Sequence, residues 1–202
     1  MALSDILVCL NASEASENRL KLAVRLAREQ GAHLIAVYEL TDSDGPLFAP
    51  RDGSGNGSQG AQRAEDAEER FRNTLRANGI TGDWHLIERG DTAELAELSK
   101  TVDLAILGQF TRDARNGTRL RPDEVAMACG RPLLIVPYVG DFVTVGEHVL
   151  IAWDDTREAT RALNDALPLL SAAKAVTVMT VMAKEKEFDQ VHFPLQRVVG
   201  HL

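Results

Sequence analysis

Short runs of branched apolar residues alternate along the chain with longer segments whose apolar positions recur every three or four residues. The apolar runs at residues 5–10, 33–38, 103–107 and 133–136 predict strands buried in a sheet, and residues 84–88 predict one more. Between them, segments near residues 13–31, 62–78, 91–98 and 122–129 have helical periodicity. This alternation predicts an α/β fold with a five-stranded parallel sheet and helices on both faces.

Local signals support the predicted helix ends. Ser13 precedes the first helical segment and is expected to cap it, and Gly31 is expected to end it. Asp91 and Glu94 have the spacing of a capping box, and Pro122 suits the first turn of a helix. These signals place the predicted helices between the predicted strands.

Residues 41–60 are rich in glycine and proline and are predicted to form a mobile loop without regular structure. The segment does not follow the GxxxxGK[ST] pattern of a phosphate-binding loop, and it contains no lysine. We therefore interpret it as a flexible connection.

Five strands by residue 137 predict one complete domain over residues 1–140. In open parallel sheets, ligands bind beyond the carboxyl ends of the strands, where the strand order reverses. The loops that follow the first and fourth strands, at residues 11–13 and 108–121, are thus the candidate site.

The chain then repeats itself. Residues 6–13 align without gaps on residues 149–156, and the same offset of 143 places Leu20 on Leu163 and Ile35 on Val178. The repeat predicts a second, incomplete domain over residues 147–202 that has the same topology. Its first strand would lack a neighbour on one side, so we expect this part to pack on the first domain or on another chain.

Composition limits the classes of partner. Lys and Arg total 22 against 30 Asp and Glu, and a net charge of −8 argues against nucleic acid. No apolar run is long enough to span a membrane, and no secretory signal precedes the first strand, so we predict a cytoplasmic protein with no membrane partner. The five histidines are scattered and the two cysteines lie apart, so we predict no metal site.

The two cysteines and the other nucleophiles give little support for catalysis. Cys9 is expected in the core, Cys129 near a helix end is expected to be accessible, and no Ser-His-Asp order or GxSxG elbow is present. We therefore expect no enzyme activity.

The segments ILVCLNASEASENRLKLAVRLAREQGAHLIAVY, VDLAILG, GRPLLIVP and VLIAWDDTREATRALNDALPLL together resemble the universal stress protein family, in its tandem-domain form. The resemblance implies the strand order 3-2-1-4-5 of the adenine-nucleotide alpha-hydrolase-like fold. It also implies a homo-oligomer, or a pseudo-dimer of two domains, formed through the edge of the fifth strand.

Some members of this family bind ATP through an acidic residue after the first strand and a glycine motif, GxxG-(nine residues)-G[ST], after the fourth. The resemblance makes ATP the candidate ligand, and the motifs by themselves establish no cofactor. In this chain the acidic position is Asn11, and Arg121 stands where the final glycine should fall. The first site is therefore degenerate, and Asp154 of the second repeat keeps the acidic residue. We expect ATP binding of a complete second domain, whose phosphate loop would lie beyond residue 202. The candidate nucleotide contacts are Asn11, Ser13, Val37, Gly108, Arg115, Gly117, Thr118 and Asp154.

The sequence leaves two alternatives open. Arg112, Arg115, Arg119 and Arg121 could grip a phosphate-bearing ligand, or they could form a solvated loop balanced by Asp113, Asp123 and Glu124. The protein could be a stress-response regulator, or it could be a small-molecule or flavin-binding α/β enzyme that shares only the fold.

Overall fold

The computed structural model describes residues 3–40, 57–88, 90–111, 118–142 and 144–181, together with residues 198 and 200. The chain divides into two compact units, Ala2–Val143 and Thr144–Leu202. That both units are universal stress protein domains stays a prediction. No helix among the described residues is long and apolar enough to cross a membrane.

The first unit alternates strands and helices as the hydrophobic pattern predicts. Its elements are β1 (Asp5–Leu10), α1 (Glu14–Gln30), β2 (His33–Glu39), α2 (Gly57–Asn78), β3 (Gly82–Ile87), α3 (Thr92–Ser99), β4 (Leu104–Gly108), α4 (Pro122–Cys129) and β5 (Leu133–Val136). The five strands form one parallel sheet in the order β3-β2-β1-β4-β5, so the predicted fold class and strand order are confirmed. β1 is central, and the strand order reverses between β1 and β4.

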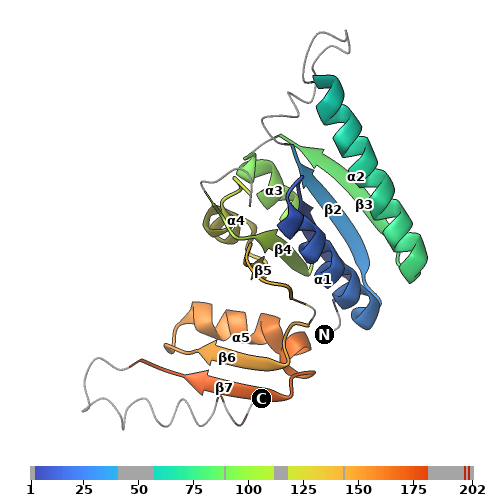
Figure 1. Cartoon of the computed structure of the whole chain (residues 1–202). Helices are drawn as coiled ribbons and strands as arrows, with labels where there is room; N and C mark the ends of the chain where they lie inside the picture. The colour runs from blue at the N-terminus through green and yellow to red at the C-terminus, as the bar shows by residue number, and fades with distance from the viewer. Residues whose placement is uncertain are drawn as a thin grey trace. The chain divides into compact units, whose positions relative to one another are not determined.

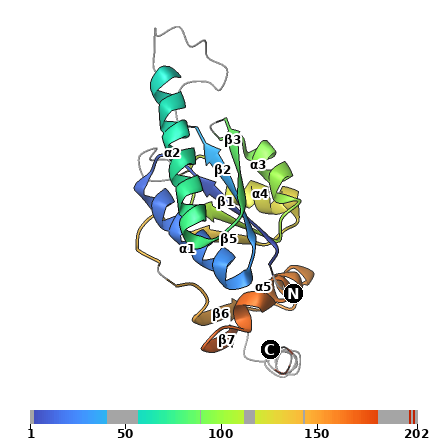
Figure 2. The same ribbon diagram turned by 90° about the vertical axis from the view of Figure 1, so that its right-hand side faces the viewer.

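Helices cover both faces of this sheet (Figures 1 and 2). Helices α1 and α2 lie on one face, whereas α3 and α4 lie side by side on the other. The face under α3 and α4 holds a cluster of buried apolar side chains that includes Leu7, Val37, Leu95 and Val125. Burial of these branched side chains stabilises the sheet by roughly 25 cal/mol for each Å² of apolar surface removed from water.

Two predicted boundaries differ from the structure by two residues or more. β3 begins at Gly82 rather than residue 84, because Gly82 and Asp83 already pair with Leu34 and Ile35 of β2. The two strands approach so closely there that a Cβ at Gly82 would lie 2.2 Å from the carbonyl oxygen of Leu34. Helix α2 begins at Gly57, ahead of the predicted start at Gln62. The first turn of a helix places few demands on its residues, since its N–H groups need no partner within the helix, so glycines there do not prevent it. Of the predicted loop, residues 41–56 lie outside the described residues and 57–60 are helical.

The second unit consists of β6 (His148–Ala152), α5 (Arg157–Leu170) and β7 (Ala175–Met179), with β6 and β7 parallel. Its order of elements, strand, helix and strand, is that of β1, α1 and β2 in the first unit. The ungapped alignment is wrong beyond the helix, however. Leu7 pairs with Ile35 in the first unit, whereas Leu150, the counterpart of Leu7, pairs with Thr177. The segment from strand to strand is therefore one residue shorter in the second unit. Among the described residues, β6 pairs with β7 alone.

Candidate functional site

The candidate site lies beyond the carboxyl ends of β1 and β4. β1 leads into a polar turn whose centre is Asn11, a side chain that is nearly buried. The Asn11 side-chain oxygen accepts hydrogen bonds from the backbone N–H of Ser13 at 3.1 Å and from the Ser13 hydroxyl at 2.6 Å. The backbone N–H of Asn11 donates to the hydroxyl of Ser16 at 3.0 Å. The turn is thus closed by its own side chains.

Ser13 is the N-cap residue of α1, as predicted, but its side chain accepts no capping hydrogen bond from the helix. The prediction of a side-chain cap is wrong: the Ser13 hydroxyl donates its proton to Asn11, and its oxygen accepts from no N–H of the first turn.

The equivalent turn of the second unit has the same arrangement with a charged residue. Asp154 accepts from the N–H of Thr156 at 3.2 Å and from the Thr156 hydroxyl at 2.6 Å. Thr156 also caps α5 by accepting from the N–H of Ala159 at 3.1 Å. Hydrogen bonds from Thr156 hold the pKa of the Asp154 carboxyl below its usual range. Asp154 is exposed at the helix N-terminus, as an ionised carboxylate.

At the end of β4, Gly108 lies against a side chain that the sequence analysis did not single out. A Cβ at Gly108 would lie 2.7 Å from a terminal guanidinium nitrogen of Arg19 on α1. Arg19 is fully buried and its Nε donates to the carbonyl of Cys9 at 3.0 Å. Among the described residues, neither terminal nitrogen of Arg19 has a hydrogen-bond partner. The space that glycine leaves at the end of β4 is therefore filled by the protein itself.

A second missed residue is Glu39 at the end of β2, which is 2% exposed. Its carboxylate accepts from the Thr118 hydroxyl at 2.5 Å and from the backbone N–H groups of Gly90 and Arg119, each at 3.2 Å. Thr118 in turn accepts from the N–H of Leu120 at 3.0 Å. Glu39 thus ties the end of the β4–α4 loop and the β3–α3 turn to the sheet, and the hydroxyl of Thr118 is fully engaged.

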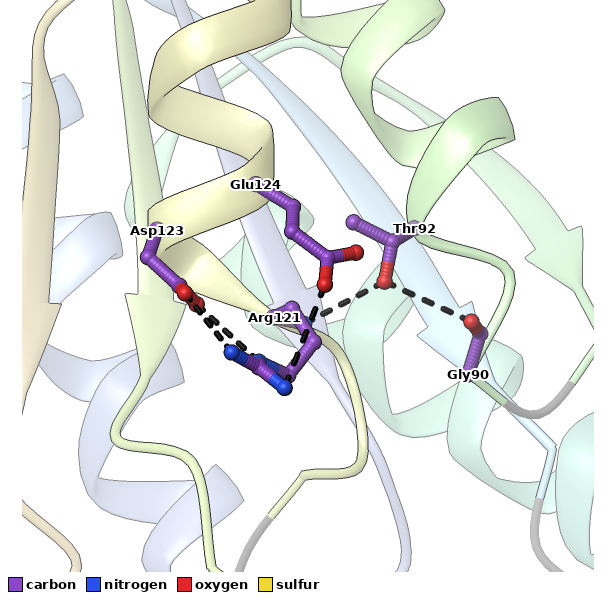
Figure 3. Close-up of polar contacts among 5 residues, drawn as sticks. All are labelled: Gly90, Thr92, Arg121, Asp123 and Glu124. Atoms are coloured by element: carbon purple, nitrogen blue, oxygen red, sulfur yellow. Dashed lines mark hydrogen bonds and ion pairs between the residues drawn. The ribbon is translucent and has the colours of Figure 1, made fainter.

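Arg121 stands at the N-cap of α4 and is held by acids of the same helix (Figure 3). Its guanidinium contacts Asp123 through two hydrogen bonds of 3.1 and 2.7 Å, and it lies 3.9 Å from Glu124. The hydrogen bond with Asp123 raises the pKa of Arg121, and the same bond lowers the pKa of Asp123. The ring of Phe110 lies beneath the guanidinium, 5.2 Å from its carbon.

The backbone of Arg121 is held as well. Its N–H donates to the Thr92 hydroxyl at 3.2 Å, and that hydroxyl donates to the carbonyl of Gly90 at 3.4 Å (Figure 3). Asp91, the predicted cap of α3, accepts from the N–H of Glu94 at 2.9 Å, so the cap is confirmed. The reciprocal bond of the predicted capping box is not formed, because the N–H of Asp91 donates to the carbonyl of Glu88 at 3.1 Å.

The other predicted contacts are dispersed. Val37 is fully buried in the cluster under α3 and α4, so its side chain is closed to a ligand from solvent. Arg115 and Gly117 lie outside the described residues, as do Arg112 and Asp113.

A pocket of about 90 Å³ lies at the ends of β1 and β2, lined in part by Asn11, Ser13 and Tyr38. Ligand pockets for molecules of drug size measure roughly 300–1,000 Å³, so this pocket is too small for a nucleotide.

Both cysteines are buried. Burial raises the pKa of the Cys9 thiol to about 12, and the charge of Glu39 contributes to the shift. The expectation that Cys129 is accessible is wrong, because the last turn of α4 directs it into the core beside Val125. No group of three or more potential metal ligands gathers among the residues that the structure describes.

Patterns present in the sequence could have revealed both missed residues. Arg19 falls at the helical spacing of Ser16, Ala23 and Leu26, which all lie on the buried face of α1. Glu39 directly follows a strand of apolar residues and precedes Leu40. A charged residue in such a position needs a partner or a function.

No protein-family profile and no curated protein sequence matches this chain. Several solved structures, however, are similar to it. A universal stress protein from Archaeoglobus fulgidus is similar over 100% of this chain and 73% of its own, with 16% sequence identity and a TM-score of 0.72. The chain has the universal stress protein fold.

Two further similar structures cover about two thirds of the chain. An Archaeoglobus fulgidus universal stress protein in complex with dAMP is 18% identical over 67% of this chain and 98% of its own, with a TM-score of 0.46. An Arabidopsis thaliana family protein with AMP bound is 12% identical over 66% and 91%, with a TM-score of 0.43.

Proposed function

We propose that the chain is a stress-response regulatory protein of the universal stress protein type, which binds partners or ligands and catalyses no reaction. In this proposal its first unit lacks a working adenine-nucleotide site, and the second unit is the candidate for ATP through Asp154. The observation that carries the proposal is the position of Arg19. Its guanidinium fills the space beside Gly108, where a glycine would otherwise let a phosphate approach the backbone.

Two other features of the first unit support the same conclusion. The Arg121 side chain is neutralised by Asp123 and Glu124, which favours the balanced loop over the phosphate-gripping alternative for this arginine. The Thr118 hydroxyl is committed to Glu39, so it is not available to a ligand without breaking a bond to a buried carboxylate. Asn11 carries no charge and its oxygen is occupied by Ser13.

Titration of the full chain with ATP and AMP by calorimetry tests the proposal. Asn11→Ala should leave any ATP binding unchanged, because the first unit does not contribute it. Asp154→Asn should weaken ATP binding by about tenfold or more, since a neutral amide accepts weaker hydrogen bonds from the nucleotide than an ionised carboxylate does. Asp155→Asn is the matched control: Asp155 is also exposed, and its φ of 62° suits asparagine.

Each result is decisive for one part of the proposal. Loss of binding in Asn11→Ala would contradict the claim that the first unit is inactive. Equal binding by the wild type and Asp154→Asn, or no binding at all, would exclude the role of the second unit. A chromophore that co-purifies with the protein, detected by native mass spectrometry, would favour the flavin-binding enzyme instead.

The proposal includes self-association through the edge of the sheet. β5 is an edge strand, and Ile135 on it is 40% exposed. An exposed apolar edge invites pairing with another strand. Light scattering after size exclusion should show an assembly larger than one chain, and Ile135→Lys should shift it toward the monomer. A clean monomer of the wild type at high concentration would contradict this part.

A further inference from the structure

Helices α1 and α2 lie next to each other on one face of the sheet of the first unit (Figures 1 and 2). A groove of about 490 Å³ is lined by residues of these two helices. Its apolar floor includes Leu20 and Val24 of α1. Glu17, Leu20 and Arg70 line both this groove and the smaller pocket at the ends of β1 and β2, so the two are neighbouring parts of one surface. The groove is nevertheless separate from the Gly108 region, to which Arg19 is directed.

The rim of the groove is basic although the chain carries a net charge of −8. Lys21, Arg28 and Arg70 line it with exposed side chains. Among the described residues, none of these three side chains has an ion-pair partner. Arg25 also lines the groove, but it is paired with Glu29 at 2.7 Å. Three unneutralised cations are thus gathered beside an apolar floor, a combination that fits a ligand with both acidic and apolar groups.

The spacing of the cations favours an elongated ligand. Lys21 and Arg28 are two turns apart on α1, which is roughly 10 Å along the helix axis. Arg70 faces them from α2. Acidic side chains two turns apart on a second helix have the same spacing, and apolar side chains at every third or fourth position would meet the floor. Glu17 and Arg70 both line the end of the groove nearest the pocket, so the end at Arg28 carries the more positive charge and orients the ligand.

We propose that the α1–α2 groove is a docking site for an acidic amphipathic helix of a partner protein. The apolar face of that helix lies on Leu20 and Val24, and its acidic side chains pair with Lys21, Arg28 and Arg70. The site requires no nucleotide and does not depend on the proposed function of either unit. Through this groove the first unit could recognise a partner protein even though its nucleotide site is closed.

Fluorescence anisotropy of the full chain with a labelled synthetic helix tests the proposal. The probe is a peptide of about four turns with leucine at every third or fourth position and glutamate on both flanks. Binding should saturate at about 50 mM salt and weaken strongly at about 500 mM. The same peptide with glutamine in place of glutamate should bind at least about tenfold more weakly.

Variants locate the contact. Lys21→Gln, Arg28→Gln and Arg70→Gln combined should weaken binding by about tenfold or more, with unchanged circular dichroism. Arg70→Gln alone is compared with Arg76→Gln, the same substitution on the same helix outside the groove, which should bind as the wild type does. Equal binding of the glutamate and glutamine peptides would overturn the proposal, and this comparison needs only wild-type protein. Undiminished binding by a folded triple variant would overturn it too, as would tighter binding to phosphatidylglycerol vesicles than to the peptide.

Discussion

The hydroxyl of Thr118 donates a 2.5 Å hydrogen bond to the carboxylate of Glu39, although 79 positions separate the two residues in the chain. Both groups are buried, and the same carboxylate holds the N–H groups of Gly90 and Arg119. The contact fixes one end of the β4–α4 loop on the sheet. It therefore decides which polar groups at this edge are left for a ligand.

Replacing Glu39 should destabilise the first unit strongly. Glu39→Leu keeps the volume but leaves three donors without their acceptor, so we expect the free energy of unfolding to fall by about 3 kcal/mol. Thr118→Val removes one of these bonds and should cost about 1–2 kcal/mol. Urea denaturation measures both. Glu69→Gln, an exposed acid on α2, should change the value by less than about 0.5 kcal/mol. Equal stability of Glu39→Leu and the wild type would show that the carboxylate does not hold the loop.

The close approach of Arg19 and Gly108 predicts an energetic coupling. Gly108→Ala introduces a Cβ 2.7 Å from the guanidinium, and the buried side chain has little room to move, so the substitution should cost about 2 kcal/mol. In an Arg19→Leu background it should cost at least about 1 kcal/mol less, because the guanidinium is gone. A double-mutant cycle from urea denaturation measures the difference. Strict additivity would show that the two residues do not compete for the same space.

Gly82 and Gly31 should respond differently to alanine. At Gly82 the new Cβ would meet the backbone oxygen of Leu34 at 2.2 Å, which cannot move without breaking the β2–β3 pairing, so we expect a loss of about 3 kcal/mol or more. Gly31 has a φ of 68° with nothing within 4 Å, so only backbone strain applies there, about 1–2 kcal/mol. Thermal unfolding of the two variants ranks them. A smaller loss at Gly82 than at Gly31 would contradict the strand spacing.

Burial of Cys9 predicts a loss of stability in alkaline solution. The thiol has a pKa of about 12 in the folded protein against 9.0 for an ordinary thiol. Between these values the unfolded chain releases the proton and the folded protein keeps it, so the unfolded state binds fewer protons and stability falls as the pH rises. The stabilisation is fully present below pH 9.0 and is lost toward pH 12.

The contribution of Cys9 should be about 1.4 kcal/mol per pH unit in this range. Urea denaturation at several pH values should therefore show a shallower alkaline decline for Cys9→Ala than for the wild type. Cys129→Ala retains Cys9 and should decline as steeply as the wild type. Parallel curves for the wild type and Cys9→Ala would contradict the burial of this thiol in a protonated form.

The alternation of apolar runs and amphipathic segments was sufficient to predict the class of fold, because buried strands and surface helices have different periodicities. The residues at which helices and strands begin and end could not be predicted as well from this pattern. Gly82 belongs to β3 because it pairs with Leu34, a contact between strands that no local pattern records. The one-residue difference between the units is similarly visible only in the pairing of Leu150 with Thr177.

The candidate site, too, could be predicted only in part from the sequence. The sequence placed Asn11 and Ser13, and also Asp154, at the ends of strands, and the two turns around them have matching hydrogen bonds. It did not indicate that Gly108 would face Arg19, or that Thr118 would be bound to Glu39. Each of these pairs joins residues far apart in the chain, and a pattern within one segment has no information about the other.

By itself, then, the sequence determined the order of strands and helices and the residues at the ends of the central strands, because burial of apolar side chains imposes a period on each element. Only the tertiary structure decided what those strand-end residues contact. Arg19 fills the space at Gly108, Glu39 holds Thr118, and α1 and α2 bring Lys21, Arg28 and Arg70 to one groove. Charges and hydroxyls act over a few ångströms, so their partners are set by the packing of elements and not by their order in the chain.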